Sequence, residues 1–310
     1  MMKSAWISAA RGGWLLVMLA TFHSAAWGQG APTAGAQAEM QAAIDAARKA
    51  QVGGPSDVKL ADQAVIKLPK GFVYVPPTEG QRLLKAMGNR GGDGLLGLIF
   101  PDSDAEWFVA MRFVKSGYIK DDDAKEWKVD ELLSGLKEGT EESNKERIAR
   151  GFPEIEVVGW IEAPKYDAQT HRLVWSLSSK IKGAPAGTEG GVNYNTYALG
   201  RDGYISMNLV TGMKSIEVEK PVAHQLLAAL EYNDGKRYTQ FNSATDHIAE
   251  FGLAALIGGV AAKKLGLFAL IAAFLVKFAK IIGIAAIALI ALISKLMGRK
   301  KEEGGTPPRA

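Results

Sequence analysis

The chain has 310 residues, of which 47% are hydrophobic and 23% charged, and it contains no cysteine. This composition excludes a disordered or collagen-like polymer and allows one large domain or two smaller ones. The lack of cysteine excludes a disulfide framework, a thiolate zinc site, a thiol nucleophile and a lipidated N-terminal cysteine. The net charge of +4 favours nucleic-acid binding only if the excess charge lies on the folded surface.

Residues 1–28 have the layout of a secretory signal peptide. Lys3 and Arg11 precede an apolar run at residues 14–20, and small residues follow at positions 24–28. The apolar run is shorter than the ~20 residues that cross a bilayer, so an uncleaved N-terminal anchor is the weaker alternative. We expect cleavage after Ala26 or Gly28 and export of the mature chain.

The C-terminal residues predict a membrane-anchor region at 248–298, followed by a basic cytoplasmic tail at 299–310. Leu265–Ser294 would be about 45 Å long as a helix, which exceeds the ~30 Å hydrocarbon core. The most buried span is expected at about 281–297, because lysines are costly at mid-span. Flanking cations then orient a single transmembrane pass in the cytoplasmic (inner) membrane, with the domain in the periplasm. The residues that define this anchor are Lys277, Lys280, Ile281, Ile293, Lys295, Arg299, Lys300 and Lys301.

A second geometry stays open for the same region. At 100° per residue, Lys263, Lys277, Lys280 and Lys295 share one face of about 100°. Such a helix could lie in the interface of an anionic bilayer, or pair its apolar faces in a homo-oligomer. The expected partners are therefore the lipid bilayer, an envelope protein and a second copy of the chain.

Between these ends we expect a peripheral helical arm and linker at 29–60 and a periplasmic domain at 61–247. Strand patterns occur in runs and do not alternate with helices, which predicts an α+β fold with a mainly antiparallel sheet and packed helices. The expected strands are 64–68, 71–75, the segment ending at Phe100, 107–114, 155–161, 171–181, 194–199 and 204–210. The expected helices are 39–48, one starting at Pro77, 121–150 and 221–230.

Three polar patterns could carry chemistry. Asp121, Asp122 and Asp123 could bind a cation, although a carboxylate cap at a helix N-terminus is the simpler interpretation. The glycine-rich loop at 88–97, with Arg90, could hold an anion or form a packed turn. His171 with Asp167 could act as a general base, or their hydrogen bonds could fix a turn.

No established catalytic or cofactor motif accompanies these patterns. The sequence contains neither G-x-S-x-G nor H-E-x-x-H, and its glycine-rich loop lacks the spacing of a nucleotide-binding loop. We therefore expect no cofactor. Four tryptophans are expected to build the core, with a carbohydrate or peptide platform as the alternative: Trp107, Trp127, Trp160 and Trp175.

Several ordered motifs resemble the bacterial membrane-anchored domain-of-unknown-function family 2167. They are residues 68–72, the loop 91–97, Gly117–Ala124, Gly159-Trp160, Pro164–His171, Leu199–Arg201, and residues 252–257 with 261–266. The resemblance implies a signal peptide, a periplasmic domain and a C-terminal anchor, and no defined activity. The matching positions with chemical potential are Arg90, Asp93, Asp121, Asp122, Asp123, Asp167, His171 and Arg201.

Three functional hypotheses follow. The first is an envelope binding or scaffold module, the second is a hydrolase or metal-dependent enzyme that uses His171 and nearby aspartates, and the third is a membrane-active tail helix. The charge distribution disfavours nucleic acid, because residues 1–28 carry +2 and residues 248–310 carry +6, which leaves the body at −4. The absence of a catalytic set favours the first hypothesis.

Overall fold

A computed structural model describes residues 34–89, 92–125, 127–149, 152–185 and 187–258. The expected signal peptide at 1–28 and the anchor positions from Lys277 to Lys301 lie outside these residues. Within the described part, the structure has no helix whose length and apolarity would suffice to cross a membrane.

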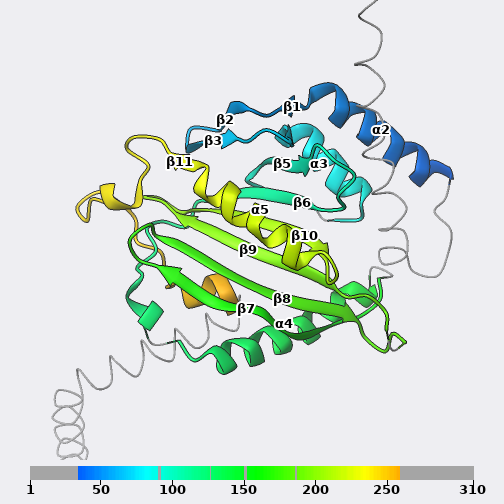
Figure 1. Cartoon of the computed structure of the whole chain (residues 1–310). Helices are drawn as coiled ribbons and strands as arrows, with labels where there is room; N and C mark the ends of the chain where they lie inside the picture. The colour runs from blue at the N-terminus through cyan, green and yellow to red at the C-terminus, as the bar shows by residue number, and fades with distance from the viewer. Residues whose placement is uncertain (1–33, 90–91, 126, 150–151, 186, 259–310) are drawn as a thin grey trace, which may run out of the picture. The chain divides into compact units, whose positions relative to one another are not determined.

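An eight-stranded antiparallel sheet forms the centre of the fold (Figure 1). Its strand order is β1-β4-β5-β6-β10-β9-β8-β7. The longest pairing joins β8, β9 and β10 in continuous register, whereas the edge strand β7 shifts register against β8 three times. The strands are β1 (Val52–Gly53), β4 (Phe72–Val75), β5 (Leu95–Pro101), β6 (Phe108–Val114), β7 (Ile155–Asp167), β8 (Arg172–Ile181), β9 (Gly191–Leu199) and β10 (Tyr204–Gly212).

A smaller antiparallel sheet has the order β11-β3-β2. It contains β2 (Ser56–Leu60), β3 (Ala64–Leu68) and β11 (Leu230–Tyr232). The consecutive strands β3 and β4 thus belong to different sheets, although only residues 69–71 separate them. The sequence did not predict β2 or β11, because both are short and only one face of β2 is buried.

Helices cover both faces of the large sheet. Helix α5 (Ile216–Ala228) packs on β9 and β10, and α4 (Val129–Ala149) packs on β7 (Figure 1). Helices α2 (Ala34–Ala50) and α3 (Pro77–Ala86) pack against each other beside β4 and β5. Two short 3₁₀ helices, η1 (Asp122–Lys125) and η2 (Tyr238–Gln240), and the helical residues 254–258 lie outside these elements.

Side-chain alternation along the strands separates two hydrophobic cores. On β9, Tyr194 and Ala198 point into the core shared with α5 and the small sheet, while Tyr197 and Leu199 point into the core on the side of α4. A third core joins α2 and α3 to β4, β5 and β6. The expected core tryptophans pack in the first two: Trp107 in the α5 core, and Trp127, Trp160 and Trp175 in or against the α4 core.

The α+β class with a large antiparallel sheet is confirmed, and several boundaries differ. The helix expected from Asp121 begins at Val129, after the separate 3₁₀ turn η1. The helix expected from Pro221 begins at Ile216 and contains this proline. Proline lacks the N–H that would bond to Glu217, but the preceding turn is closed because Ser215 O accepts bonds from Val218 N and Glu219 N.

Two segments expected outside the domain pack into it. In the expected arm, Ala43, Ile44 and Ala47 of α2 are buried in the third core. In the expected anchor region, Leu253, Leu256 and Ile257 are buried in the core on the side of α4. The folded body therefore includes residues on both sides of the expected 61–247 boundaries.

Candidate functional site

Asp123 caps a helix far from it in the sequence. Its Oδ1 accepts a hydrogen bond from Leu253 N at 3.1 Å, and its Oδ2 accepts one from Ala254 N at 3.0 Å. Helical residues 254–258 follow. A carboxylate at a helix N-terminus satisfies free N–H groups and complements the helix dipole. The capping interpretation of Asp123 is thus correct, but the capped helix is not the one that follows it.

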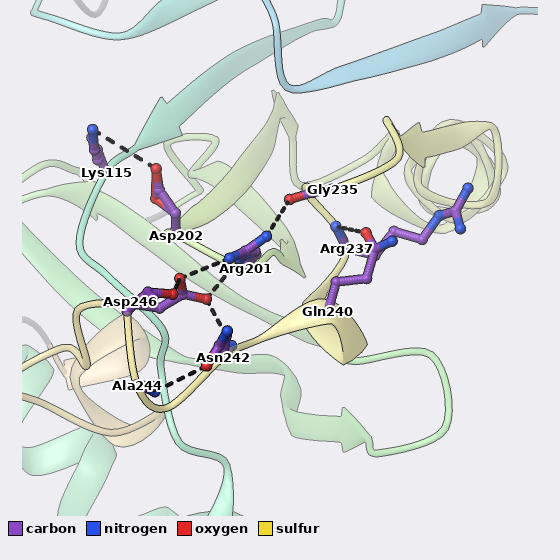
Figure 2. A network of polar contacts seen from close by, with 10 residues as sticks. Lys115, Arg201, Asp202, Gly235, Arg237, Gln240, Asn242, Ala244 and Asp246 are labelled. Atoms are coloured by element: carbon purple, nitrogen blue, oxygen red, sulfur yellow. Dashed lines mark hydrogen bonds and ion pairs between the residues drawn. The ribbon is translucent and has the colours of Figure 1, made fainter.

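Arg201 binds a carboxylate of the same C-terminal stretch. Its Nε and Nη2 donate to the two oxygens of Asp246 at 2.6 and 2.8 Å (Figure 2). Asp246 also accepts from Asn242 N at 2.8 Å and from the Thr245 hydroxyl at 2.9 Å. The two bonds from Arg201, then that from Asn242, hold the pKa of the Asp246 carboxyl far below its ordinary range. Arg201 therefore fixes the turn at residues 242–246.

Tyr118 adds backbone and aromatic contacts to this stretch. Tyr118 N donates to His247 O, and Ala249 N donates to Tyr118 O, each at 2.8 Å. Its ring stacks on Phe241 at 3.9 Å and on Tyr238 at 4.4 Å between centroids. Gly117, at φ +85°, allows the close approach, because a Cβ there would lie 2.7 Å from His247.

We name residues 242–258 the exit segment, since they lead from the domain to the apolar residues beyond it. Arg201, Tyr118 and Asp123 contact it in chain order near its start, middle and end, and we call these three residues the clamp. All three lie within motifs that carry the family resemblance. The main role of this part of the candidate site is to hold the exit segment on the domain.

Asp121 and His171 meet through a tyrosine. The Tyr166 hydroxyl donates to Asp121 Oδ2 at 2.7 Å and lies 3.2 Å from His171 Nδ1. His171 Nδ1 is 3.8 Å from the same Asp121 oxygen. Burial, followed by the bond to Asp121, raises the pKa of the Tyr166 hydroxyl far above its ordinary range. The His171 ring also packs on Tyr238, at 4.1 Å between centroids.

Asp167 and Asp122 do not join this group. Asp167 accepts from Gln169 N at 2.9 Å and from the Thr170 hydroxyl at 2.6 Å, which fixes the β7–β8 turn. These bonds, that of Thr170 first, lower the pKa of the Asp167 carboxyl. Asp122 is exposed in η1. The proposed convergence of His171, Asp167 and the aspartate triplet is thus limited to His171 and Asp121.

The described part of the glycine-rich loop packs on β6. Arg112 donates to Gly92 O at 3.2 Å and to Asp93 O at 3.5 Å. Gly94, at φ +75°, lies so close to Phe113 that a Cβ would come within 2.2 Å of the Phe113 carbonyl oxygen. This part of the loop therefore offers carbonyl oxygens to a cation. Arg90 lies outside the described residues, so anion binding by the loop with Arg90 stays a prediction, as does ligand or ion binding at Asp93.

Metal ligation finds no geometric support in the described ranges, which hold no cluster of three or more His, Asp or Glu side chains suited to a metal ion. Sequence reasoning also missed Tyr118, Tyr238, Phe241 and Asp246. Their signal was the glycine before Tyr118 and the pair of aromatic residues just ahead of a turn. Neither signal indicates a partner so distant in sequence.

The fold and clamp define a class: an antiparallel α+β domain whose surface motifs fix the chain segment that leads to a C-terminal apolar stretch. The chain belongs to the family described as "Protein of unknown function (DUF2167)", whose model matches residues 52–288. A search of curated proteins gave no match.

A structural comparison returned the solution structure of cyanobacterial PsbP (CyanoP) from Synechocystis sp. PCC 6803. That structure shares 8% sequence identity with the chain, at a TM-score of 0.34. The match covers 59% of this chain and 91% of that one.

Proposed function

We propose that the protein is a membrane-anchored binding or scaffold module of the cell envelope, with its α+β domain in the periplasm. The observation that carries the proposal is the clamp on the exit segment, which ends one residue before the apolar stretch 259–297. The signal-peptide layout and the C-terminal cations supply the expected orientation.

The physical argument concerns orientation. A domain joined to its anchor by a flexible linker samples many orientations above a bilayer, because each linker residue adds conformational freedom. Here three contacts, to Asp246, to the backbone around Ile248 and to the Leu253 and Ala254 N–H groups, hold the chain up to the start of its last described helix. Because the clamp holds these residues on the domain, fewer free residues separate the domain from the expected anchor, which lowers the entropic cost of binding an envelope partner.

A topology measurement tests the membrane part of the proposal. A reporter that is active only in the cytoplasm is fused after Arg299, and a matched fusion is made after Gly258. We expect the Arg299 fusion to be active and the Gly258 fusion to be inactive. Activity of a periplasmic reporter after Arg299 would contradict the single-pass orientation.

A cross-linking experiment tests the binding part. Intact membranes that carry the full chain are cross-linked and purified beside an anchor-only control. We expect a partner above that control, and we expect less of it when a ten-residue Gly/Ser linker separates Gly258 from Gly259. Equal recovery with and without the linker would contradict the role of the clamped exit segment, and no partner above the control would contradict a binding module.

An exchange of the anchor distinguishes the membrane-active tail hypothesis from the scaffold proposal. Residues 259–310 are replaced by a foreign single-pass helix joined directly after Gly258. If the foreign helix restores recruitment of the partner and reverses any phenotype caused by deletion of the tail, the tail acts only as an anchor. Failure of a well-inserted foreign anchor to restore them would favour a membrane-active or oligomerising tail over the scaffold proposal.

A further inference from the structure

A cleft of about 430 Å³ opens where the two sheets meet, beside His171. Its volume is in the range of small-molecule sites. Strand ends of both sheets and the η2 turn line it, among them His171, Arg172, Glu231, Arg237 and Tyr238. We call it the His171 cleft.

The cleft contains a half-buried cation, Arg172, which forms no ion pair with a carboxylate in the described structure, although the Asp167 carboxylate acts on it electrostatically. Arg172 donates from Nη1 to Leu227 O in the last turn of α5, and from Nη2 to Leu230 O at the start of β11 at 3.0 Å. Its burial lowers the pKa of the guanidinium, so charge there is costly without a counter-ion. A guanidinium has five N–H donors, and these two bonds leave three.

The remaining charges leave the cleft positive. Arg237 is exposed at its rim, where Nη1 lies 3.4 Å from Asp234, and its side chain extends away from the Arg201–Asp246 pair (Figure 2). The carboxylate of the lining, Glu231, is bound by Lys67 at 2.8 Å. A weakly positive cleft with planar guanidinium donors fits a monoanionic carboxylate better than a dianionic phosphate.

His171 supplies a hydrogen-bond acceptor. Because the Tyr166 hydroxyl gives its proton to Asp121, its oxygen must accept from His171 Nδ1–H. In that tautomer the lone pair lies on Nε2, to which no described residue is hydrogen-bonded. The residue adopts φ +53°, a conformation rare outside glycine, and its ring is held by Tyr238. The ring is thus fixed at the cleft with an acceptor unused.

We propose that the His171 cleft binds a small organic monoanion: a carboxylate held by Arg172 and Arg237, with a neighbouring hydroxyl that donates to His171 Nε2. The inference does not depend on the scaffold role or on membrane anchoring. It needs only the geometry of these three side chains around one cavity.

The test measures binding of named probes to the full chain in detergent by thermal shift. Lactate, mandelate and gluconate are each compared with the corresponding amide, and with phosphate and chloride at equal ionic strength. We expect at least one hydroxy acid to raise the melting temperature in a saturable manner, and its amide and the inorganic anions to have no such effect. No response to any of the three acids, or an equal response to phosphate, would overturn the proposal.

Binding to substituted proteins tests which side chains form the site. Arg172→Gln and Arg237→Gln are each expected to weaken binding of the responding acid at least tenfold. His171→Phe, which keeps the aromatic contact, is expected to remove the advantage of the hydroxy acid over its deoxy analogue. Arg82→Gln, far from the cleft, is the control. Since Arg172 also binds the end of α5, unchanged affinity in Arg237→Gln and His171→Phe suffices to overturn the proposal even if Arg172→Gln does not fold.

Discussion

Asp123 and Leu253 are 130 residues apart in the sequence and share a hydrogen bond of 3.1 Å, in which the carboxylate caps the helix that leads to the C-terminal region. The residue before Leu253 is a glycine, and a Cβ at this position would lie 2.5 Å from Asp123 Oδ2. The lack of a side chain at Gly252 therefore leaves room for the Asp123 carboxylate. The family motif Gly117–Ala124, which contains the aspartate triplet, thus binds backbone N–H groups at Leu253 and Ala254.

Removal of the cap should destabilise the exit segment. Asp123→Ala leaves the N–H groups of Leu253 and Ala254 without their acceptor, and loss of an N-cap costs about 0.5–2 kcal/mol. Chemical denaturation of the full chain measures this cost. The neighbouring exposed residue provides the control, because Asp122→Ala should change the free energy of unfolding by less than about 0.5 kcal/mol. Equal losses in both variants would show that the cap contributes nothing.

The Arg201–Asp246 pair should matter more than a similar pair in solvent. Arg82 also binds a carboxylate through two nitrogens, at 2.8 and 3.1 Å from Glu39, but both side chains are about half exposed. The Asp246 side chain is 12% exposed and also accepts backbone and hydroxyl bonds. Arg201→Gln should therefore lower the melting temperature by several degrees, and Arg82→Gln by less. The reverse order would refute this role of Arg201.

The same pair predicts a pH dependence. Because Arg201 lowers the pKa of the Asp246 carboxyl below the ordinary 3.8, the stabilisation is present above pH 3.8 and is lost as the pH falls through the lower, folded-state value. The difference in unfolding free energy between the wild type and Arg201→Gln should be constant from pH 5 to 7 and shrink below pH 3.8. A difference that grows on acidification would contradict the assignment.

Glu219 on α5 should show the opposite pH dependence. Burial raises the pKa of its carboxyl above the ordinary 4.5, and the Thr211 hydroxyl donates to it. The carboxyl favours its neutral form, so its contribution is complete below pH 4.5 and is lost as the pH rises through the folded-state pKa. Glu219→Gln should gain stability relative to the wild type between pH 4 and 8, by a few degrees in melting temperature. The exposed Glu217→Gln is the control, and a gain of equal size there would contradict the prediction.

The exit segment should also be part of the hydrophobic core. Leu253 is fully buried, and truncation of a buried leucine to alanine costs about 2–5 kcal/mol. Leu253→Ala should therefore lower the denaturation midpoint strongly. Val218→Ala, at an 80% exposed position of α5, should have little effect. A small effect at Leu253 would mean that residues beyond 247 are dispensable for the fold.

The sequence predicted the positions of strands and helices better than the contacts between them. The continuous buried run of β8, the alternation on β10 and the Asp-Gly turn between β9 and β10 are local signals, and these strands lie near the expected positions. The separation of β3 from β4 into two sheets was not predictable, because it depends on β11 pairing with β3 from 164 to 168 residues away. Helix α5 began before its proline for a similar reason: Ile216 and Glu219 are buried by tertiary contacts.

The candidate site shows the same division. Residue type indicated that Asp123 caps a helix and that Asp167 fixes a turn, since carboxylates satisfy nearby N–H groups. It could not indicate which helix Asp123 would cap, or that Arg201 would select Asp246 among many carboxylates. Such choices are set by the register of the large sheet, which brings the end of β6, the start of β8 and the end of β9 together at one end of the sheet.

Hydrogen exchange of the full chain tests the central claim, that the clamp holds the exit segment on the domain. The amides to follow are Ala249, Leu253 and Ala254, which bond to Tyr118 O and to the Asp123 carboxylate. We predict that all three are protected in the wild type and in Asp122→Ala, and that Leu253 and Ala254 lose protection at least tenfold in Asp123→Ala. Rapid exchange of these amides in the wild type, or equal protection in Asp123→Ala, would contradict the account.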